Sequence, residues 1–296
     1  MVMEMRRFEY ACLYLLILLL FFFGNAVSSS VVMSLKIWWN TLIPGMLVPM
    51  ILIRFLYLRQ GFDALGSSFF NRIFHMKNNG IAYVVCPMLL GFPAGSLFID
   101  QAYEEHHLNA EGMRRLLLCC CFPTPGFVIL TLGTLYQDIA VGWKLYFCII
   151  IGGCILLFMT RKQIVIPSLS SSHVPSLFSA LSDSIWYSVR SMLLIGVYLL
   201  LFLSIASILQ FFLPSFLILP FQLIAEFSSG VLLCATLSLP IKIKLLITVA
   251  LLAFGGLCVH LQILSSLQHH PFSYLTFLRY RLLHACFAVL IACIII

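Results

Sequence analysis

Two apolar segments of this chain are interrupted by glycine, proline and serine in a way that an ordinary spanning helix is not. The first interruption is Gly-Phe-Pro-Ala-Gly-Ser at 91–96, and the second is Glu-Phe-Ser-Ser-Gly at 226–230. A further broken stretch follows each of them, at 121–127 and at 254–262, with nearly the same spacing in both pairs. Paired breaks of this kind are the best sequence pointer to a transporter substrate site near the membrane midplane.

The composition places these segments in a membrane. Hydrophobic residues make up 62% of the chain and charged residues only 9%, whereas a soluble domain carries about a quarter charged residues. Several runs reach the roughly 20 apolar residues that a spanning helix needs. The sequence therefore predicts an all-α integral membrane protein, a polytopic helical bundle with the lipid bilayer as its main partner.

The net charge of +7 does not indicate nucleic-acid binding, because the basic residues lie at the ends of apolar segments, where they set orientation. The 11 cysteines lie in apolar stretches without the spacing of a disulfide framework or a zinc site. Adjacent cysteines at 119–121 point about 100° apart on a helix, so they do not form a metal cluster. We predict no metal and no cofactor.

Sequence motifs for enzymes are also missing. The chain has no GxxxxGK[ST] phosphate loop, no HExxH and no GxSxG. No pair of aspartates within apolar segments suggests an intramembrane protease. The expectation is a protein that is not an enzyme.

Residues 1–30 are predicted to form an N-terminal transmembrane helix. A basic pair, Arg6 and Arg7, precedes an apolar run that ends in the small-residue sequence Gly24-Asn25-Ala26. This pattern also fits a cleaved signal peptide. We favour an uncleaved helix, because further apolar spans follow at once.

The remaining apolar segments are 37–58, 81–99, 115–136, 142–160, 191–213, 216–237, 245–267 and 282–296. Pro44 is expected to interrupt the first of them. Two intervening stretches, 62–73 and 174–185, are amphipathic and are predicted to lie in the membrane interface.

The positive-inside rule favours a re-entrant hairpin at 81–99, because that arrangement places most lysines and arginines on the cytoplasmic side. For 216–237 the charge counts of a spanning and a re-entrant segment tie. The paired breaks favour the re-entrant alternative. Residues 31–162 and 163–296 then form two repeats of opposite membrane orientation, an inverted-topology repeat with two re-entrant, broken-helix hairpins.

A helix that stops inside the bilayer leaves backbone groups that lipid cannot satisfy, so such ends survive where protein or a wet cavity covers them. Half-helix N-termini also favour anions. Glu226 is expected to face a cavity and to orient substrate or carry a coupling proton. An alternative is that the breaks are tight helix crossings built on small residues. The predicted substrate-binding residues are Gly95, Ser96, Thr124, Glu226, Ser229, Gly230, His260 and Gln262. The predicted helix breaks are Pro44, Gly91, Pro93, Pro123, Pro125, Gly255 and Gly256.

The order of these motifs resembles the sporulation integral membrane protein family YlbJ, also called SpoVV, within the nucleoside-recognition or Gate-domain group. The matching elements lie at 91–95, 111–118, 121–129, 226–230, 254–262 and 279–281. Members of that family tend to carry Asn-Asn-Ser where this chain has Phe122-Pro123-Thr124. The resemblance covers about residues 35–296 and implies two Gate-like repeats, at 31–162 and 163–296. It also implies a bacterial cell membrane as the location and a role in endospore formation, with movement of dipicolinate across the mother-cell-derived forespore membrane.

These observations lead to the expectation of a secondary transporter for a small organic anion, with dipicolinate suspected. One alternative is a non-transporting membrane assembly or interaction protein of sporulation, which would act through exposed faces such as 62–73. Another is a nucleoside carrier. Homo-oligomers or sporulation membrane partners are compatible with each of these readings.

Overall fold

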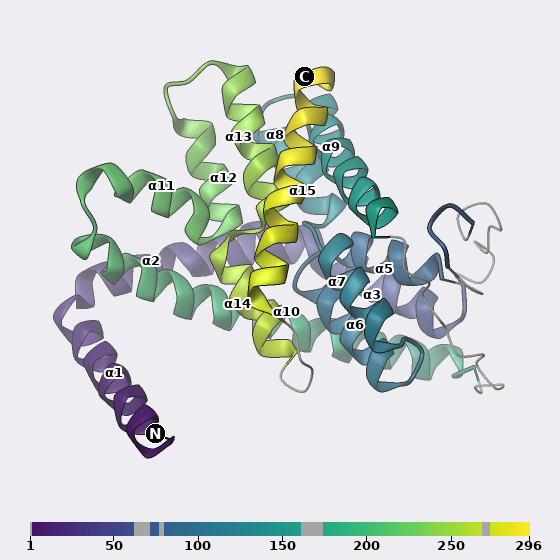
Figure 1. Ribbon diagram of the computed structural model, residues 1–296, viewed down its shortest axis with the longest axis horizontal. Coiled ribbons are helices and arrows are strands. Elements are labelled where there is room, and N and C mark those ends of the chain that lie inside the picture. Colours follow the sequence, from purple (N-terminus) through teal and green to yellow (C-terminus); the bar gives the residue numbers. More distant parts are fainter. Residues whose placement is uncertain (1, 62–71, 77–79, 161–173, 268–272) are drawn as a thin grey trace.

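The computed structural model describes residues 2–61, 72–76, 80–160, 174–267 and 273–296, and it is helical, without strands, over these ranges (Figure 1). Within these ranges, five helices are long and apolar enough to cross a membrane. The predicted all-α helical bundle of an integral membrane protein is therefore confirmed. Most of the predicted interface segment at 62–73 lies outside the described residues.

The N-terminal helix is shorter than predicted. Helix α1 (Val2–Phe22) ends well before residue 30, and α2 (Gly24–Ile37) begins after Phe23 and turns away from it (Figure 1). Through the π-helical segment η1 (Trp38–Leu42), α2 continues into α3 (Ile43–Leu58).

Pro44 does not break this helix, contrary to the prediction. It lies in the first turn of α3, directly after the π-helical turn, and the helical segment Gly24–Leu58 is continuous. A proline ring clashes with the carbonyl four residues earlier in a regular α-helix. A wider π turn moves that carbonyl away, so the chain accommodates the proline without ending the helix.

Two hairpins of short helices correspond to the first members of the paired breaks. One consists of α5 (Ala82–Leu90) and α6 (Ala94–Glu104), and the other of α11 (Ser215–Ala225) and α12 (Phe227–Thr236). At about 1.5 Å per residue, none of the four can cross a hydrocarbon core of about 30 Å. Whether the hairpins turn back within the bilayer stays a prediction.

Two broken helices follow the hairpins. Helix α7 (Ala110–Cys119) is separated by non-helical residues from η3 (Gly126–Thr131) and α8 (Leu132–Leu135). Helix α13 (Ile241–Phe254) is separated from α14 (Gly256–Ser266) by Gly255, which is left-handed with φ of 93°.

Longer helices hold these elements in place. Helix α9 (Ile139–Met159) packs against α15 (Tyr274–Ile295), which also packs along α13. Helix α10 (Leu177–Leu209), extended by η4 (Gln210–Phe212), lies beside α2 and α3. Figure 1 shows α2 and α10 running across the group formed by α9, α13 and α15.

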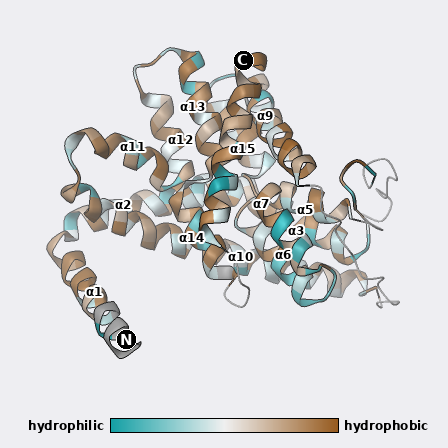
Figure 2. Ribbon diagram, viewed as in Figure 1, coloured by the Kyte–Doolittle hydropathy of each residue, from teal (hydrophilic) through white to brown (hydrophobic). Residues whose placement is uncertain are grey.

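The amphipathic stretch at 174–185 is not a separate interfacial element, because most of it forms the first turns of α10. Its apolar side chains still face outward, and Phe178 is 81% exposed. Apolar residues cover most of the helices, with hydrophilic residues concentrated on α6 and on part of α15 (Figure 2). The break at 91–93 and the break at 120–125 both lie in the hydrophobic core.

Candidate functional site

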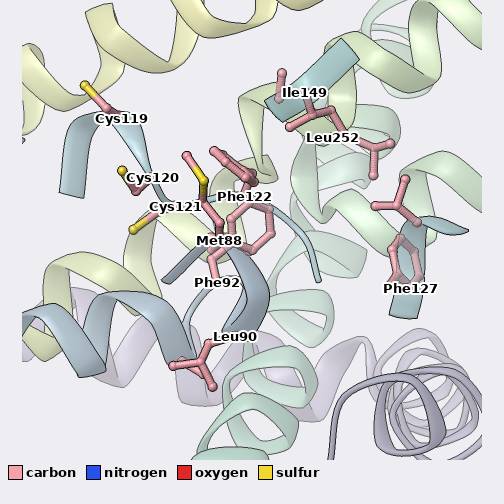
Figure 3. Packing of buried hydrophobic residues seen from close by; sticks show 14 of the residues in the cluster. Met88, Leu90, Phe92, Cys119, Cys120, Cys121, Phe122, Phe127, Ile149 and Leu252 are labelled. Atoms are coloured by element: carbon pink, nitrogen blue, oxygen red, sulfur yellow. The ribbon is translucent and has the colours of Figure 1, made fainter. Parts of the chain in front are cut away.

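The four broken segments meet at one place in the interior, which we name the break junction (residues 91–93, 122–125, 226–227 and 255–256). The backbone N–H of Phe92 donates to the carbonyl of Phe122 at 3.1 Å. The Phe227 ring packs edge-on against Phe92, with 4.9 Å between ring centroids, and against Phe127 at 5.3 Å. Figure 3 shows Phe92, Phe122 and Met88 clustered beside the cysteines at 119–121. Segments far apart in the sequence therefore form one packed unit.

Glycine is required at the junction both for conformation and for space. Gly91 and Gly256 have φ of 68° and 72°, a left-handed region that other residues rarely adopt. A Cβ on Gly91 would lie 2.6 Å from the backbone nitrogen of Thr124, and one on Gly256 would lie 2.7 Å from that of Phe227. Gly91 therefore lets the breaks at 91–93 and 122–125 come into backbone contact, and Gly256 does the same for those at 226–227 and 255–256.

Glu226 caps α12 rather than facing a cavity. Its carboxylate accepts hydrogen bonds from the backbone N–H of Ser228 at 3.0 Å, from the N–H of Ser229 at 2.7 Å and from the Ser228 hydroxyl at 2.6 Å. The side chain is 2% exposed. An N-cap carboxylate satisfies unpaired helix donors and offsets the partial positive charge of the helix N-terminus. The α12 terminus, predicted as an anion site, is thus filled by the chain's own carboxylate.

Replacing Glu226 with glutamine should lower stability by about 1–3 kcal/mol, because the amide oxygen can still accept from one helix N–H but the NH₂ that replaces the second oxygen cannot accept from the other. Glu226→Asp should lose less, since aspartate is a favoured N-cap. Thermal unfolding of the purified protein in detergent measures both. Glu104→Gln, at an exposed position, is the control and should unfold like the parent. A glutamine variant as stable as the parent would contradict the capping role.

The remaining predicted site residues are buried and engaged in local contacts. Ser96 donates to the Pro93 carbonyl at 2.6 Å, and Thr124 Oγ1 accepts from the Phe127 N–H at 3.2 Å. His260 Nε2 lies 2.9 Å from the Phe254 carbonyl oxygen. Gln262 donates to Cys258 Sγ at 3.4 Å. These side chains therefore form local hydrogen bonds in and next to the break junction. The nearby cavity lies beside the junction and not within it.

Gly95 and Gly230 are the crossing points of the two hairpins. A Cβ on Gly95 would lie 2.7 Å from the Pro87 carbonyl oxygen, and one on Gly230 would overlap the carbonyl oxygen of Leu223. Their lack of a side chain serves close helix packing. At these two positions the small residues therefore act as tight helix crossings, which is the alternative that the sequence analysis left open.

Ser229 connects the break junction to a cavity of about 260 Å³ between α2, α10, α11 and α12. Two amides lie in its wall, where Gln222 donates to Gln210 Oε1 at 2.8 Å. Gln210 in turn donates to the Ser207 carbonyl at 3.1 Å. The polar residues that line the cavity are Ser30, Ser207, Gln210, Gln222 and Ser229. All of them carry uncharged side chains.

Sequence reasoning missed the glutamines, although a signal was present. Gln210 and Gln222 each stand alone in an apolar segment, where an amide is costly unless it meets another polar group. The two segments had to be adjacent for this pair to form, and the sequence did not show that adjacency.

Two arginines that the sequence assigned to membrane orientation are buried, and one of them, Arg281, lies beside the junction. Arg281 of α15 donates to the carbonyl of Cys121 and, at 2.8 Å, to that of Leu118. Arg115 donates to the Leu157 carbonyl at 2.7 Å and to that of Phe74 at 2.8 Å. Two of these acceptors, Leu118 and Leu157, lie in the last turns of α7 and α9, where carbonyls lack partners within the helix.

The Arg281 position could have been recognised from its spacing. Residues 277, 281, 284, 288 and 292 follow one face of α15, and all five are buried. An arginine on such a face points into the protein.

Among the described residues, no group of three or more His, Cys, Asp or Glu side chains is placed to hold a metal ion. The thiols at 119–121 are buried and are not in disulfides. Comparison with family models found no match, and neither curated proteins nor solved structures gave one.

Proposed function

We propose that this chain is a secondary membrane transporter for a small organic anion. The observation that carries the proposal is the convergence of four helix breaks at one buried junction, beside a cavity with a polar lining. Broken helices at membrane depth are tolerated where they are buried in protein or line a cavity, and transporters place their substrate sites at such breaks. The suspected cargo, dipicolinate moving across a forespore membrane, rests on the motif resemblance alone.

The order of elements supports two repeats. In the first half, α3 is followed by the α5–α6 hairpin, the broken helix α7–η3–α8 and the long helix α9. In the second half, α10 is followed by the α11–α12 hairpin, the broken helix α13–α14 and the long helix α15. We propose that the two halves have opposite membrane orientation and that transport proceeds by rocking of one against the other.

The balance of buried charge supports an anionic cargo. Within the described residues, the buried side chains with a formal charge are Arg54, Arg115, Arg281 and Glu226. The single carboxylate is held by α12 as its cap. An interior with more guanidinium groups than carboxylates favours negatively charged ligands.

One observation favours a second candidate, a carrier of neutral nucleosides. The cavity beside Ser229 is lined by amides, hydroxyls and apolar side chains, with no charged group. A wall of this kind can bind an uncharged solute that offers several hydrogen-bonding groups. This candidate keeps the architecture and changes only the cargo.

Transport should be measured in proteoliposomes that contain the full chain, with labelled dipicolinate and a labelled nucleoside as alternative cargoes. We expect dipicolinate uptake above that of protein-free vesicles, and a reduction of at least tenfold in Ser229→Leu, because leucine would fill the cavity next to the break junction. Ser29→Leu, at an exposed position on α2, is the matched control and should transport normally. Uptake of the nucleoside alone would favour the second candidate. No uptake of either cargo by folded protein would contradict transport.

The orientation of the second half can be tested by thiol labelling. The exposed native cysteines, Cys12, Cys286 and Cys293, would first be replaced by serine. With a re-entrant α11–α12 hairpin, a cysteine at Lys242 should react with a membrane-impermeant maleimide on intact cells, and a cysteine at Arg279 only after permeabilisation. Both positions are exposed in the fold. The reverse labelling pattern would show that residues 216–237 span the bilayer and would remove the inverted repeat.

A further inference from the structure

Arg54 differs from the other two buried arginines. It lies near the end of α3 and is 7% exposed. Arg115 and Arg281 donate to backbone carbonyls, but over the described ranges no hydrogen-bond acceptor contacts the Arg54 guanidinium. Its Nε is buried without a hydrogen-bond partner, and so is that of Arg281, so the difference from Arg281 lies in the terminal N–H groups. A guanidinium carries five N–H donors, and leaving them unused inside a protein is costly. Buried polar groups are otherwise almost always paired.

Aromatic rings surround this guanidinium. Its central carbon lies 4.7 Å from the centroid of the Tyr187 ring of α10 and 5.4 Å from that of Tyr57. The Tyr57 ring packs edge-on against Phe98 at 4.7 Å. Cation–π contacts stabilise the positive charge. They supply no lone pair to the N–H groups, so the hydrogen-bonding capacity of Arg54 remains.

The tyrosine hydroxyls near Arg54 are held weakly. Tyr57 Oη lies 3.4 Å from Tyr83 Oη and 3.3 Å from His107 Nδ1. Tyr187 donates to the Ala94 carbonyl at 3.5 Å. Hydroxyl hydrogen bonds are strongest near about 2.7–2.8 Å, so these long contacts leave the hydroxyls able to turn toward a ligand.

The cluster is also adjacent to the break junction. Ala94 is the first residue of α6, directly after the break at 91–93. Through Tyr187, the cluster therefore contacts the start of a half-helix. A ligand at Arg54 would lie between α3 and α10, one from each half of the chain, beside that break.

We propose that Arg54, with the hydroxyls of Tyr57 and Tyr187, binds the carboxylate group of a small organic anion. The planar guanidinium fork matches a carboxylate, which can accept two parallel hydrogen bonds. Glu226 is engaged at α12. The Asp100 and Glu105 carboxylates lie close enough to act electrostatically on Tyr187, so a ligand carboxylate would supply Arg54 with hydrogen-bond acceptors rather than with the first negative charge near it. The organic character of that ligand rests on the proposed function, but the binding site does not require transport.

The test is ligand-induced thermal stabilisation of the purified full chain in detergent, with four probes. These are benzoate, dipicolinate (pyridine-2,6-dicarboxylate), inorganic phosphate and phosphatidylglycerol in mixed micelles. We expect a concentration-dependent rise in Tm with at least one carboxylate. Affinity should fall at least tenfold in Arg54→Met, and in Arg54→Lys, which keeps the charge but lacks the fork. Arg190→Met, at an exposed position of α10, should bind like the parent.

The ligand-free variants separate binding from a structural role. Arg54→Met without ligand should unfold at the same or a higher temperature than the parent, because it no longer buries an unpaired charge. If it is too unstable to purify, Arg54→Lys decides, and parent-like carboxylate binding by that variant would overturn the proposal. Stabilisation by phosphate or phosphatidylglycerol alone, or no carboxylate response in the parent, would also overturn it. Arg54-dependent binding without uptake in proteoliposomes would support the site and contradict the proposed transport.

Discussion

Replacing Gly230 with alanine should prevent the α11–α12 hairpin from closing and should lower stability by about 3 kcal/mol or more, at the upper end of what overpacking costs. The added Cβ would overlap the carbonyl oxygen of Leu223. That oxygen belongs to a helix backbone, so the clash cannot be relieved by rotating a side chain. For a chain of this size the expected fall in Tm is roughly 5–10 °C. Thermal unfolding of the purified protein in detergent, followed by intrinsic fluorescence, measures it.

Gly24→Ala provides the matched control. Gly24 lies at the start of α2, and a Cβ there would meet nothing within 4 Å. Alanine in a helix is favoured over glycine by about 0.5–1 kcal/mol, so this variant should be as stable as the parent or slightly more stable. If Gly230→Ala unfolded at the parent temperature, the close crossing of α11 and α12 would be wrong.

The breaks themselves could be predicted because their causes are local. The glycines with positive φ at 91, 255 and 256 and the prolines at 93, 123 and 125 lie at helix ends or between helices, where local backbone preferences act. Pro44 shows the limit of this reasoning. Pro49, Pro87 and Pro220 also lie inside α-helices, so a proline in an apolar segment does not by itself end a helix.

The roles of charged residues could not be predicted in the same way. Glu226 was expected to face a cavity, since a carboxylate in an apolar segment is costly. Two backbone N–H groups in the first turn of α12 compensate for the burial of this carboxylate by donating hydrogen bonds to it. They can reach it because the backbone is extended at Glu226, where the chain enters α12. A sequence indicates that such a group has a partner, but the backbone dihedral angles decide which partner it has.

The arginines at 54, 115 and 281 extend this point. Charge counting assigned them to the membrane surface, where each would be solvated. In the structure they are buried. Arg281 donates to two carbonyls at the end of the broken helix α7, whereas Arg115 donates to the carbonyls of Phe74 and Leu157, outside the broken helices. The break after α7 and Arg281 are therefore parts of one arrangement, because that break leaves carbonyl acceptors that need a donor from elsewhere in the chain.

Replacing Arg281 with leucine should test that dependence directly. The carbonyls of Leu118 and Cys121 would lose their donors in a fully buried site, and each unsatisfied group costs about 1–3 kcal/mol. The cost of burying the guanidinium disappears at the same time, so we expect a net loss of about 2 kcal/mol, less than the two carbonyls alone would give. Thermal unfolding in detergent gives the value.

The order among variants at this position distinguishes hydrogen bonding from charge. Arg281→Lys should be at least as unstable as Arg281→Leu, because it keeps a buried charge while losing the fork that reaches both carbonyls. Arg279→Leu, exposed on the same helix, should unfold like the parent. A stable lysine variant would mean that positive charge alone is needed there. Both carbonyls lack a helical partner because α7 ends at the break at 120–125. Losing their shared donor, Arg281, should therefore destabilise the backbone at this break before any other part of the fold.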